Sequence, residues 1–380
     1  MQRWIVLFGF LCCFTLSYSQ IQPQKIKPLS YFQPRIDKGE IAGVVTLIAS
    51  KDKIISLEAS GYSNLERKVP MKTDDLFWIA SQTKPMAALA FMMLLEEQKI
   101  SLDDTLYKYI KAFKNQKVEV EIDEHTSVLR NPKRPITFRD LLNHTSGLPP
   151  EPPVQKGPYD RVILEDIMPG YAYTHLKNDP GVAQVYSNMG INIVGRMIEV
   201  LSSSRFNDFM QQRLFDPLGM KNTTFVPTEE QAARIVTSYM MDSSMLKPVA
   251  LSFTQPLTDK NRVALPYGGL FSTAADLARF CQMCLNGGEL DGRRYIKKST
   301  LDSMLVKRSK VSPFGVGFLL YKEGTYGHSG AFNTDMSIFT KSNLISVTLV
   351  QMPALMECRA YVRDAIWALE DQKNPAATKK

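Results

Sequence analysis

Histidine is scarce in this sequence, and its scarcity limits the chemistry that the chain can perform. The four histidines are His125, His144, His175 and His328. None of them lies at the short helical or strand spacing from another that shared metal ligands usually have. We therefore expect no metal site and no cofactor, and we interpret His125, His144 and His175 as structural or solvent-exposed side chains.

Cysteine is also rare, with five residues in 380. Cys12 and Cys13 lie in the apolar segment at the N-terminus, which leaves Cys281, Cys284 and Cys358. Three is an odd number for a disulfide framework. The first two are spaced as in redox and metal motifs, but they belong to a helix-periodic apolar pattern. We expect all three to be buried structural thiols.

Long apolar runs are absent after the N-terminus, so no later segment is expected to span a membrane. At the N-terminus, Arg3 precedes an apolar run from Trp4 to Leu16 and then Ser17, Tyr18 and Ser19, where two small residues flank a tyrosine. This pattern is typical of a secretory signal peptide, residues 1–19. We expect export across the inner membrane, a periplasmic location and no stable membrane insertion after cleavage. A retained N-terminal anchor is the alternative.

Blocks of basic residues interleaved with aromatics are absent as well, and this argues against a nucleic-acid partner. The formal net charge is +8, and Arg3 is the only charge in the predicted leader, so the mature chain carries 8 − 1 = +7. A scattered positive charge of this size suits an anionic cell envelope and contributes to solubility.

A serine and a lysine three residues apart begin an apolar, helix-periodic run. They are Ser81 and Lys84, followed by Pro85 in the expected first helical turn. Positions i and i+3 lie on one helix face, so the amine can activate the hydroxyl as a nucleophile. The alternative is a capping serine that precedes a solvated lysine.

The remaining pattern predicts strands at both ends of the chain and helices between them. A β-hairpin is expected near the N-terminus. The region from about 102 to 264 is expected to consist mostly of helices separated by Pro/Gly-rich loops. The expected hairpin strands are 41–49 and 54–59; the main expected helices are 136–142, 191–201, 207–214, 274–285 and 359–370; the late expected strands are 316–321, 336–339 and 345–351.

Two further polar segments are candidates for a site. Tyr186, Ser187 and Asn188 precede an expected helix, which one of the latter two can also simply cap. The segment from Gly327 to Ala331 is one residue away from the Gly-x-Ser-x-Gly elbow of α/β-hydrolases. That elbow needs a helix directly after its serine and a later histidine, and neither is expected here.

Taken together, three motifs resemble those of the penicillin-recognising serine enzymes. They are Ser81 to Lys84, Tyr186 to Asn188 and His328 to Gly330, in this order along the chain. The resemblance is greatest to class C β-lactamases, D-Ala-D-Ala carboxypeptidases and related esterases. The segments 144–148 and 268–277 also resemble this family, and the similarity extends over nearly all of the mature chain.

The resemblance implies a β-lactamase/transpeptidase-like α/β (α+β) fold with an antiparallel sheet flanked by helices and an all-helical part. The implied hydrolase domain spans 20–370, with its α/β part at about 36–80 and 267–370 and its helical part at about 81–266; a disordered tail, 371–380, follows. The implied catalytic residues are Ser81, Lys84 and Tyr186. The implied substrate-binding residues are Asn188, His328, Ser329 and Gly330, and the backbone N–H groups of Ser81 and Ala331 are the implied oxyanion hole.

The resemblance further implies hydrolysis through an acyl-enzyme on Ser81. The substrates are expected to be β-lactams or D-amino-acid peptides, small molecules or fragments derived from peptidoglycan. A carboxylesterase that uses the same residues and a non-catalytic penicillin-binding protein remain alternatives. His328 stands where many β-lactamases have lysine, so if it meets a substrate carboxylate we expect its charge, and with it carboxylate recognition, to change near neutral pH. The alternative is that His328 only forms hydrogen bonds within the strand edge or to the Tyr186 network.

Overall fold

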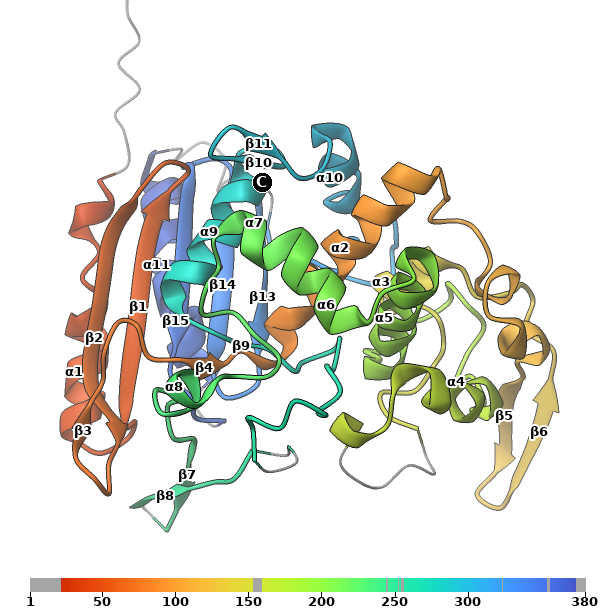
Figure 1. Cartoon of the computed structure of the whole chain (residues 1–380), viewed down its shortest axis with the longest axis horizontal. Coiled ribbons are helices and arrows are strands. Elements are labelled where there is room, and N and C mark those ends of the chain that lie inside the picture. The colour runs from red at the N-terminus through yellow and green to blue at the C-terminus, as the bar shows by residue number, and fades with distance from the viewer. Residues whose placement is uncertain are drawn as a thin grey trace, which may run out of the picture.

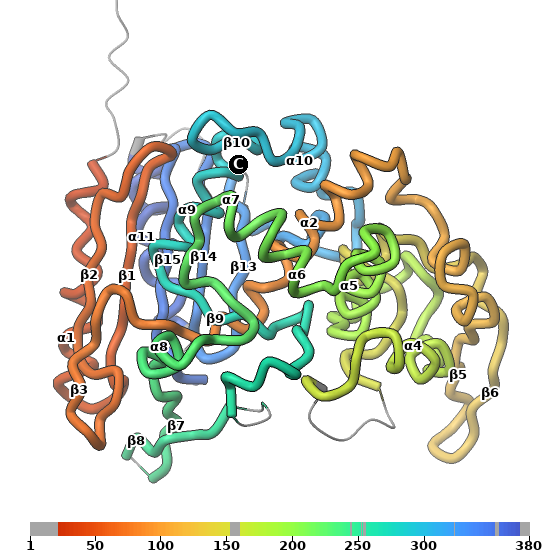
Figure 2. Tube along the Cα trace, in the orientation of Figure 1, coloured from red at the N-terminus to blue at the C-terminus, as the bar shows by residue number. Residues whose placement is uncertain are grey.

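Strands from the two ends of the chain form one antiparallel sheet. The computed structural model describes residues 22–152, 159–243, 245–251, 253, 256–322, 324–353 and 356–373. The seven strands lie in the order β12-β13-β14-β15-β1-β2-β3 (Figure 1). They are β1 (Gly43–Ser50), β2 (Ile54–Asn64), β3 (Val69–Pro70), β12 (Leu319–Leu320), β13 (Thr325–Gly330), β14 (Thr334–Phe339) and β15 (Leu344–Leu349). The predicted antiparallel sheet is confirmed. Figure 2 shows β1 and β15, the first and last of these strands along the chain, side by side.

Helices cover both faces of this sheet. Alternate residues of a strand point to opposite faces, and in β1 the side chains of Val45 and Leu47 join the core on the α9 side. Val44 and Ile48 pack instead with α1 and α11. These helices are α1 (Pro28–Asp37), α9 (Ala274–Leu285) and α11 (Met356–Lys373). Because both faces are covered, β1 and its neighbour β15 are almost entirely buried.

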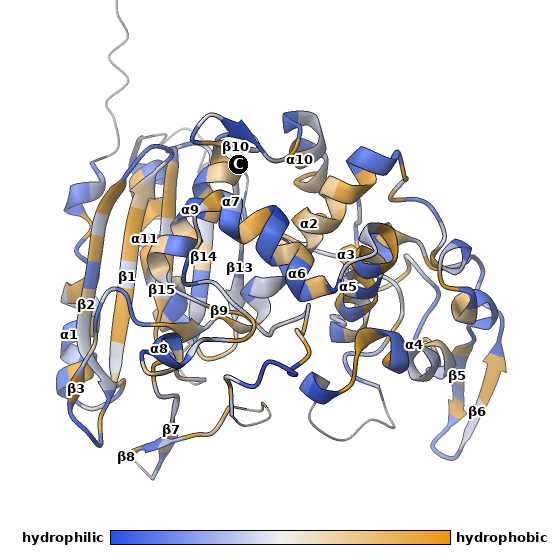
Figure 3. Cartoon of the chain, viewed as in Figure 1, coloured by the Kyte–Doolittle hydropathy of each residue, from blue (hydrophilic) through white to orange (hydrophobic). Residues whose placement is uncertain are grey.

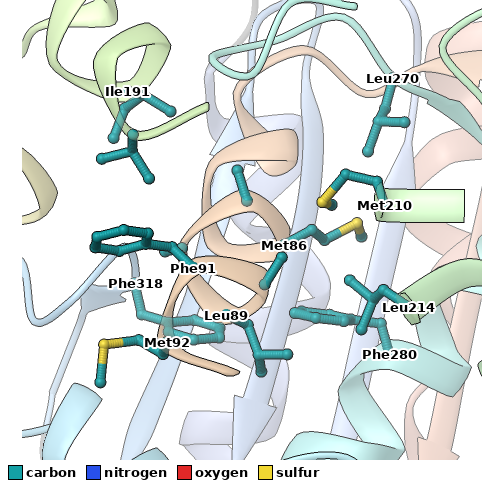
Figure 4. Packing of buried hydrophobic residues seen from close by; sticks show 14 of the residues in the cluster. Met86, Leu89, Phe91, Met92, Ile191, Met210, Leu214, Leu270, Phe280 and Phe318 are labelled. Carbon is teal, nitrogen blue, oxygen red and sulfur yellow. The ribbon is translucent and has the colours of Figure 1, made fainter. Parts of the chain in front are cut away.

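The central part of the chain is mainly helical and packs around α2 (Thr83–Gln98). Every residue from Thr83 to Leu95 is buried, and the stretch from Met86 to Leu95 is apolar on all sides, as expected of a helix inside a core (Figure 3). Side chains from α5, α6 and the sheet-facing helix α9 surround it (Figure 4). The helices are α3 (Phe138–Leu142), α4 (Leu164–Tyr173), α5 (Asn188–Ser202), α6 (Phe206–Met210), α7 (Asp216–Leu218), α8 (Glu229–Ala232) and α10 (Lys298–Met304).

Shorter elements connect these parts. The short helical turns are η1 (Pro23–Lys25), η2 (Ala80–Gln82), η3 (Leu106–Lys108), η4 (Lys111–Asn115), η5 (Tyr159–Arg161) and the π-helical turn η6 (Gln211–Phe215). The two-stranded pairs are β4 (Phe77–Trp78) with β9 (Phe271–Ser272), β5 (Val118–Asp123) with β6 (Thr126–Arg130), β7 (Tyr239–Asp242) with β8 (Met245–Pro248), and β10 (Glu289–Leu290) with β11 (Arg293–Arg294).

Several predicted elements differ from the observed ones. The hairpins β5–β6 and β7–β8 lie in the region that was expected to be mostly helical. The expected strand 316–321 is reduced to β12, because Gly317 has a φ of +77° and bends the chain before it. The last helix extends through Lys373, three residues into the predicted tail. The predicted leader and the rest of that tail lie outside the described residues.

The three remaining cysteines are free and buried, as predicted. Within the described part of the chain, no helix combines the length and the apolar character needed to cross a membrane.

Candidate active site

Ser81 lies in the short turn η2, between the strand β4 and the helix α2. The residue before it, Ala80, has a φ of +47°, a left-handed conformation that costs free energy in residues with a side chain. Neighbouring bonds hold this backbone in place: the N–H of Ile79 donates to the carbonyl of Leu270 (3.0 Å), and the Thr334 hydroxyl donates to the carbonyl of Ile79 (3.2 Å). The position of the serine is therefore fixed by both the sheet and the loop before β9.

Lys84 points from the first turn of α2 to Ser81. Its Nζ lies 3.0 Å from the Ser81 Oγ and donates to the Tyr267 carbonyl at 2.7 Å. The side chain is completely buried, and burial lowers the pKa of the Lys84 amine from 10.5 to about 7. A large fraction of the amine is therefore neutral near pH 7. A neutral amine has a lone pair, which can accept the proton of the serine hydroxyl while an N–H remains bonded to Tyr267.

Tyr186 is held over this pair by the start of α5. The next residue, Ser187, caps α5 by accepting a hydrogen bond from Gly190 N–H (3.1 Å) and donates to the Pro149 carbonyl (2.7 Å). The Tyr186 ring centroid lies 4.8 Å from the Lys84 Nζ. Burial raises the pKa of Tyr186 to about 12, and its hydrogen bond with Ser81 acts in the opposite direction. The phenol thus keeps its proton at neutral pH and can donate it, whereas Lys84 can accept one.

Two buried histidines lie behind Tyr186. The ring of His144 is 4.4 Å from the Tyr186 ring, centroid to centroid, and its Nδ1 accepts a hydrogen bond from Ser187 N–H (3.2 Å). His328 lies farther away, with 6.3 Å between its ring centroid and that of Tyr186. Phe314 contacts both imidazoles, at 4.8 and 5.8 Å between ring centroids. His144 is therefore a structural side chain, as interpreted from the sequence, and it supports Tyr186.

His328 is neutral in this environment. Its Nδ1 lies 2.6 Å from the carbonyl oxygen of Ser329, to which an Nδ1–H donates. Burial, together with the nearby Lys84, lowers the pKa of His328 to about 3. The expectation that its charge changes near neutral pH is therefore wrong, because that expectation took a solvated imidazole as reference. Its Nε2 is buried and has no hydrogen-bond partner within the described residues, so it is available as a neutral acceptor.

The end of β13 contributes the other residues of this motif. Gly330 is required by close packing, because a Cβ there would lie 2.2 Å from the Ile79 carbonyl oxygen. The Ser329 hydroxyl donates to Asp335 Oδ1 (2.6 Å), which also accepts from Arg363 of α11 (3.0 Å). A contact between Ser329 and substrate stays a prediction, and here its hydroxyl is bonded to Asp335. Ala331, whose N–H is the second predicted oxyanion donor, is exposed just after the strand.

Asn188 begins α5 and lies on the same side of the site as Tyr186. Its Nδ2 donates to Glu151 Oε1 at 2.5 Å, and its Oδ1 is buried without a partner in the described part of the chain. Sequence reasoning missed Glu151 and Tyr267. Nothing in the sequence signals the Tyr267 carbonyl, whereas Glu151 could have been found as the acidic residue in an irregular, proline-rich loop.

The sequence model of one protein family matches most of the chain. It is described as beta-lactamase and matches residues 30–370. The chain belongs to the beta-lactamase family. The predicted family and its fold class are thus confirmed. The beta-lactamase family consists of serine hydrolases and related proteins, including penicillin-binding proteins, esterases and acyltransferases.

Individual relatives show the range of this family. The lovastatin esterase of Penicillium rubens is 29% identical over 287 residues, which cover 72% of this chain and 70% of the relative. Penicillin-binding protein 4 of Amycolatopsis lactamdurans is 28% identical over 289 residues, with coverage of 72% and 70%. The solved structure of EstCE1, described as a hydrolase with promiscuous acyltransferase activity, has a TM-score of 0.75 and 23% identity, and covers 90% of this chain and 97% of its own. The fold is thus shared by hydrolases of different names.

Proposed function

We propose that this beta-lactamase-family protein is a serine hydrolase that acts through an acyl-enzyme on Ser81. The observation that carries the proposal is the buried Lys84 amine, with a pKa of about 7, placed 3.0 Å from the Ser81 Oγ. As the Oγ attacks the substrate carbonyl carbon, its proton passes to the neutral amine. The developing oxyanion is stabilised by the N–H groups of Ser81 and Ala331.

Collapse of the tetrahedral intermediate breaks the bond to the leaving group. The protonated phenol of Tyr186 is suited to donate a proton to the departing oxygen or nitrogen, because its pKa is raised to about 12. Water then attacks the acyl-enzyme, and the same groups act in the reverse direction to release the acid and restore Ser81.

Within this reaction class we favour neutral esters as substrates. β-Lactams and peptides that end in D-Ala carry a carboxylate, and a neutral His328 whose N–H is bonded to the Ser329 carbonyl offers such a group neither a charge nor a donated hydrogen bond. A small acyl ester does not need that charge. The similarity to the lovastatin esterase is consistent with this choice.

Hydrolysis of β-lactams or D-amino-acid peptides is the second candidate. Asn188 supports it, since the family resemblance assigns this residue to the substrate amide and its Oδ1 has no partner in the described residues. The similarity to penicillin-binding protein 4 is also consistent with it. A non-catalytic penicillin-binding protein is disfavoured, because a protein without turnover has no need of a buried lysine with a lowered pKa.

The decisive experiment is intact-protein mass spectrometry after incubation with a fluorophosphonate and, separately, with a labelled penicillin. We expect a single adduct on Ser81, absent from Ser81→Ala and retained in the control Ser329→Ala. Turnover of a nitrophenyl ester, a chromogenic cephalosporin and a D-Ala-D-Ala peptide then ranks the substrate classes. An adduct that persists in Ser81→Ala would refute the mechanism.

We also propose that the protein is exported to the periplasm, on the basis of the leader-like pattern from Arg3 to residue 19. N-terminal sequencing of the protein recovered from a periplasmic fraction tests this. A new terminus near Gln20 is expected, and recovery of the whole chain from the cytoplasmic fraction would contradict it.

A further inference from the structure

A carboxylate that contacts the site residue Asn188 has no established role. Glu151 is exposed and lies in the loop after α3, directly after the segment 143–150. It reaches Asn188, whose Nδ2 donates to its Oε1 at 2.5 Å. The two chain segments are joined again nearby, where the N–H of Asn188 donates to the Pro150 carbonyl (3.0 Å). Glu151 is thereby held beside the first residue of α5.

The other titratable groups of the site do not offset this charge at neutral pH. Partial burial raises the pKa of Glu151, while its hydrogen bond with Asn188 and the charge of Lys84 act in the opposite direction. The lysine amine has a pKa of about 7 and loses its charge above that pH. His144 and His328 are kept neutral by burial, and Tyr186 keeps its proton. Of these groups in the described residues, Glu151 alone is charged when Lys84 is neutral, which is the state that can activate Ser81.

A second acceptor lies next to this carboxylate. The Asn188 side chain uses its Nδ2 on Glu151, so its Oδ1 is left as an acceptor, and this atom is buried with no partner in the described residues. Buried acceptors without partners are rare in folded proteins, and each calls for an explanation such as a ligand. A carboxylate beside a free amide oxygen is complementary to a primary ammonium, which has three donors and a positive charge.

We propose that Glu151 and Asn188 form a subsite for a protonated amine on the acyl part of the substrate. The proposal rests on the proposed acyl-enzyme function and narrows its substrates to esters or amides of amine-bearing acids. The subsite also disfavours acyl groups that end in a carboxylate, which would meet Glu151 as a like charge. Glu151 is thus a specificity-determining residue, and it takes no part in the bond-breaking steps.

The size of the effect follows from the exposure of Glu151. Two unit charges about 5 Å apart, in surroundings between water and a protein surface, interact by an amount that corresponds to roughly a five- to twenty-fold change in kcat/KM. The effect should decrease with added salt because this carboxylate is exposed to solvent.

The experiment compares three 4-nitrophenyl esters of matched length at pH 7.5. Their acyl groups are 3-aminopropanoyl, butanoyl and succinyl, which are cationic, neutral and anionic, and spontaneous hydrolysis is subtracted. In Glu151→Gln the amide oxygen can still accept from Asn188 while the charge is lost. We expect the cationic-to-neutral ratio of kcat/KM to fall five- to twenty-fold and the anionic-to-neutral ratio to rise by a similar factor. The butanoyl ester should change by less than about two-fold.

The control is Glu121→Gln, which removes an exposed carboxylate from the hairpin β5–β6 and should leave all three ratios unchanged. Unchanged ratios in Glu151→Gln, with Ser81 still labelled by the fluorophosphonate, would overturn the subsite and leave the proposed function intact. A loss of more than ten-fold on the butanoyl ester would also overturn it, because Glu151 would then take part in the chemistry. Failure of the wild-type protein to label at Ser81 would instead refute the proposed function itself.

Discussion

Replacing Lys84 by methionine should abolish activity and make the protein more stable at low pH. Methionine is of similar length and carries no charge, so it can occupy the buried position of the lysine in the first turn of α2. The variant loses the hydrogen bonds of the Lys84 Nζ to Ser81 and Tyr267. It also removes a cation that the fold buries completely, and the balance of these two effects depends on pH.

The magnitude follows from the pKa of the buried amine. The pKa of a solvated lysine is 10.5, whereas that of Lys84 in the folded protein is about 7, a difference of 10.5 − 7 = 3.5. At 1.36 kcal/mol per unit this is about 5 kcal/mol. Because the folded pKa is the lower one, the unfolded chain binds more protons between these values, and wild-type stability rises with pH across that window. The full cost of burying the protonated amine, about 5 kcal/mol of folding free energy, applies below about pH 7 and vanishes near pH 10.5.

The variant is free of this penalty. If each lost hydrogen bond costs about 1 kcal/mol, Lys84→Met should be about 3 kcal/mol more stable than wild type at pH 6 and about equally stable at pH 9. The change between the two pH values, about 2.5 kcal/mol, does not depend on the hydrogen-bond cost, since that cost is the same at both.

Reversible urea unfolding of both proteins at pH 6, 7.5 and 9 measures these differences. Lys51→Met, which removes an exposed lysine from the turn between β1 and β2, serves as the matched control and should show no such dependence. A stability difference between Lys84→Met and wild type that is the same at all three pH values would refute the lowered pKa. The assignment of Lys84 as the base would then lose its physical support.

The other predictions concern the rate, the charge of the third motif and the sheet. The kcat/KM of a neutral ester should rise about ten-fold per pH unit up to about pH 7 and then level off, because only the neutral Lys84 accepts a proton; a profile without this limb would contradict the mechanism. Tyr186→Phe should lower turnover by about 10² to 10⁴ with an unchanged circular dichroism spectrum, and full activity would exclude the phenol as the acid. The ratio of kcat/KM for anionic and neutral substrates should not change through titration of His328 between about pH 5.5 and 8, and a rise at low pH that His328→Gln abolishes would contradict its neutrality. Arg363→Met should destabilise the protein by about 3 to 5 kcal/mol in urea unfolding, since it leaves Asp335 buried without its cation, and a loss below 1 kcal/mol would contradict this.

Local patterns of the sequence predicted the elements that depend on local rules. The i, i+3 spacing of Ser81 and Lys84 gave their proximity, and the apolar period gave α9 with its observed bounds. The hairpin β1–β2 followed from two β-branched runs around a polar break. The hairpin β5–β6 was missed although Val118, Val120 and Ile122 alternate with acidic residues, because its surroundings read as helical.

The electrostatic properties of the site could not be predicted, since they depend on burial. A histidine in a sequence has its ordinary pKa, and only the packing of His328 against Phe314 and Tyr186 shows that it stays neutral. The hydrogen bonds of Lys84 with Tyr267 and of Asn188 with Glu151 could not be predicted either, because they depend on the fold. Tyr267 and Glu151 are distant from them in sequence, and the fold alone brings them together.

The pairing of β1 with β15 also determines when this protein can become active during its synthesis. Val45 lies opposite Leu349, so the two central strands are joined by contacts between residues 349 − 45 = 304 positions apart. A ribosome releases β1 and the Ser81 segment long before β15, and until then one edge of β1 has no partner. Contacts of such long range slow folding, and an unpaired strand edge favours aggregation. The chain must therefore be completed before its sheet, and the site anchored on it, can form, and incomplete chains expose a strand edge that favours aggregation.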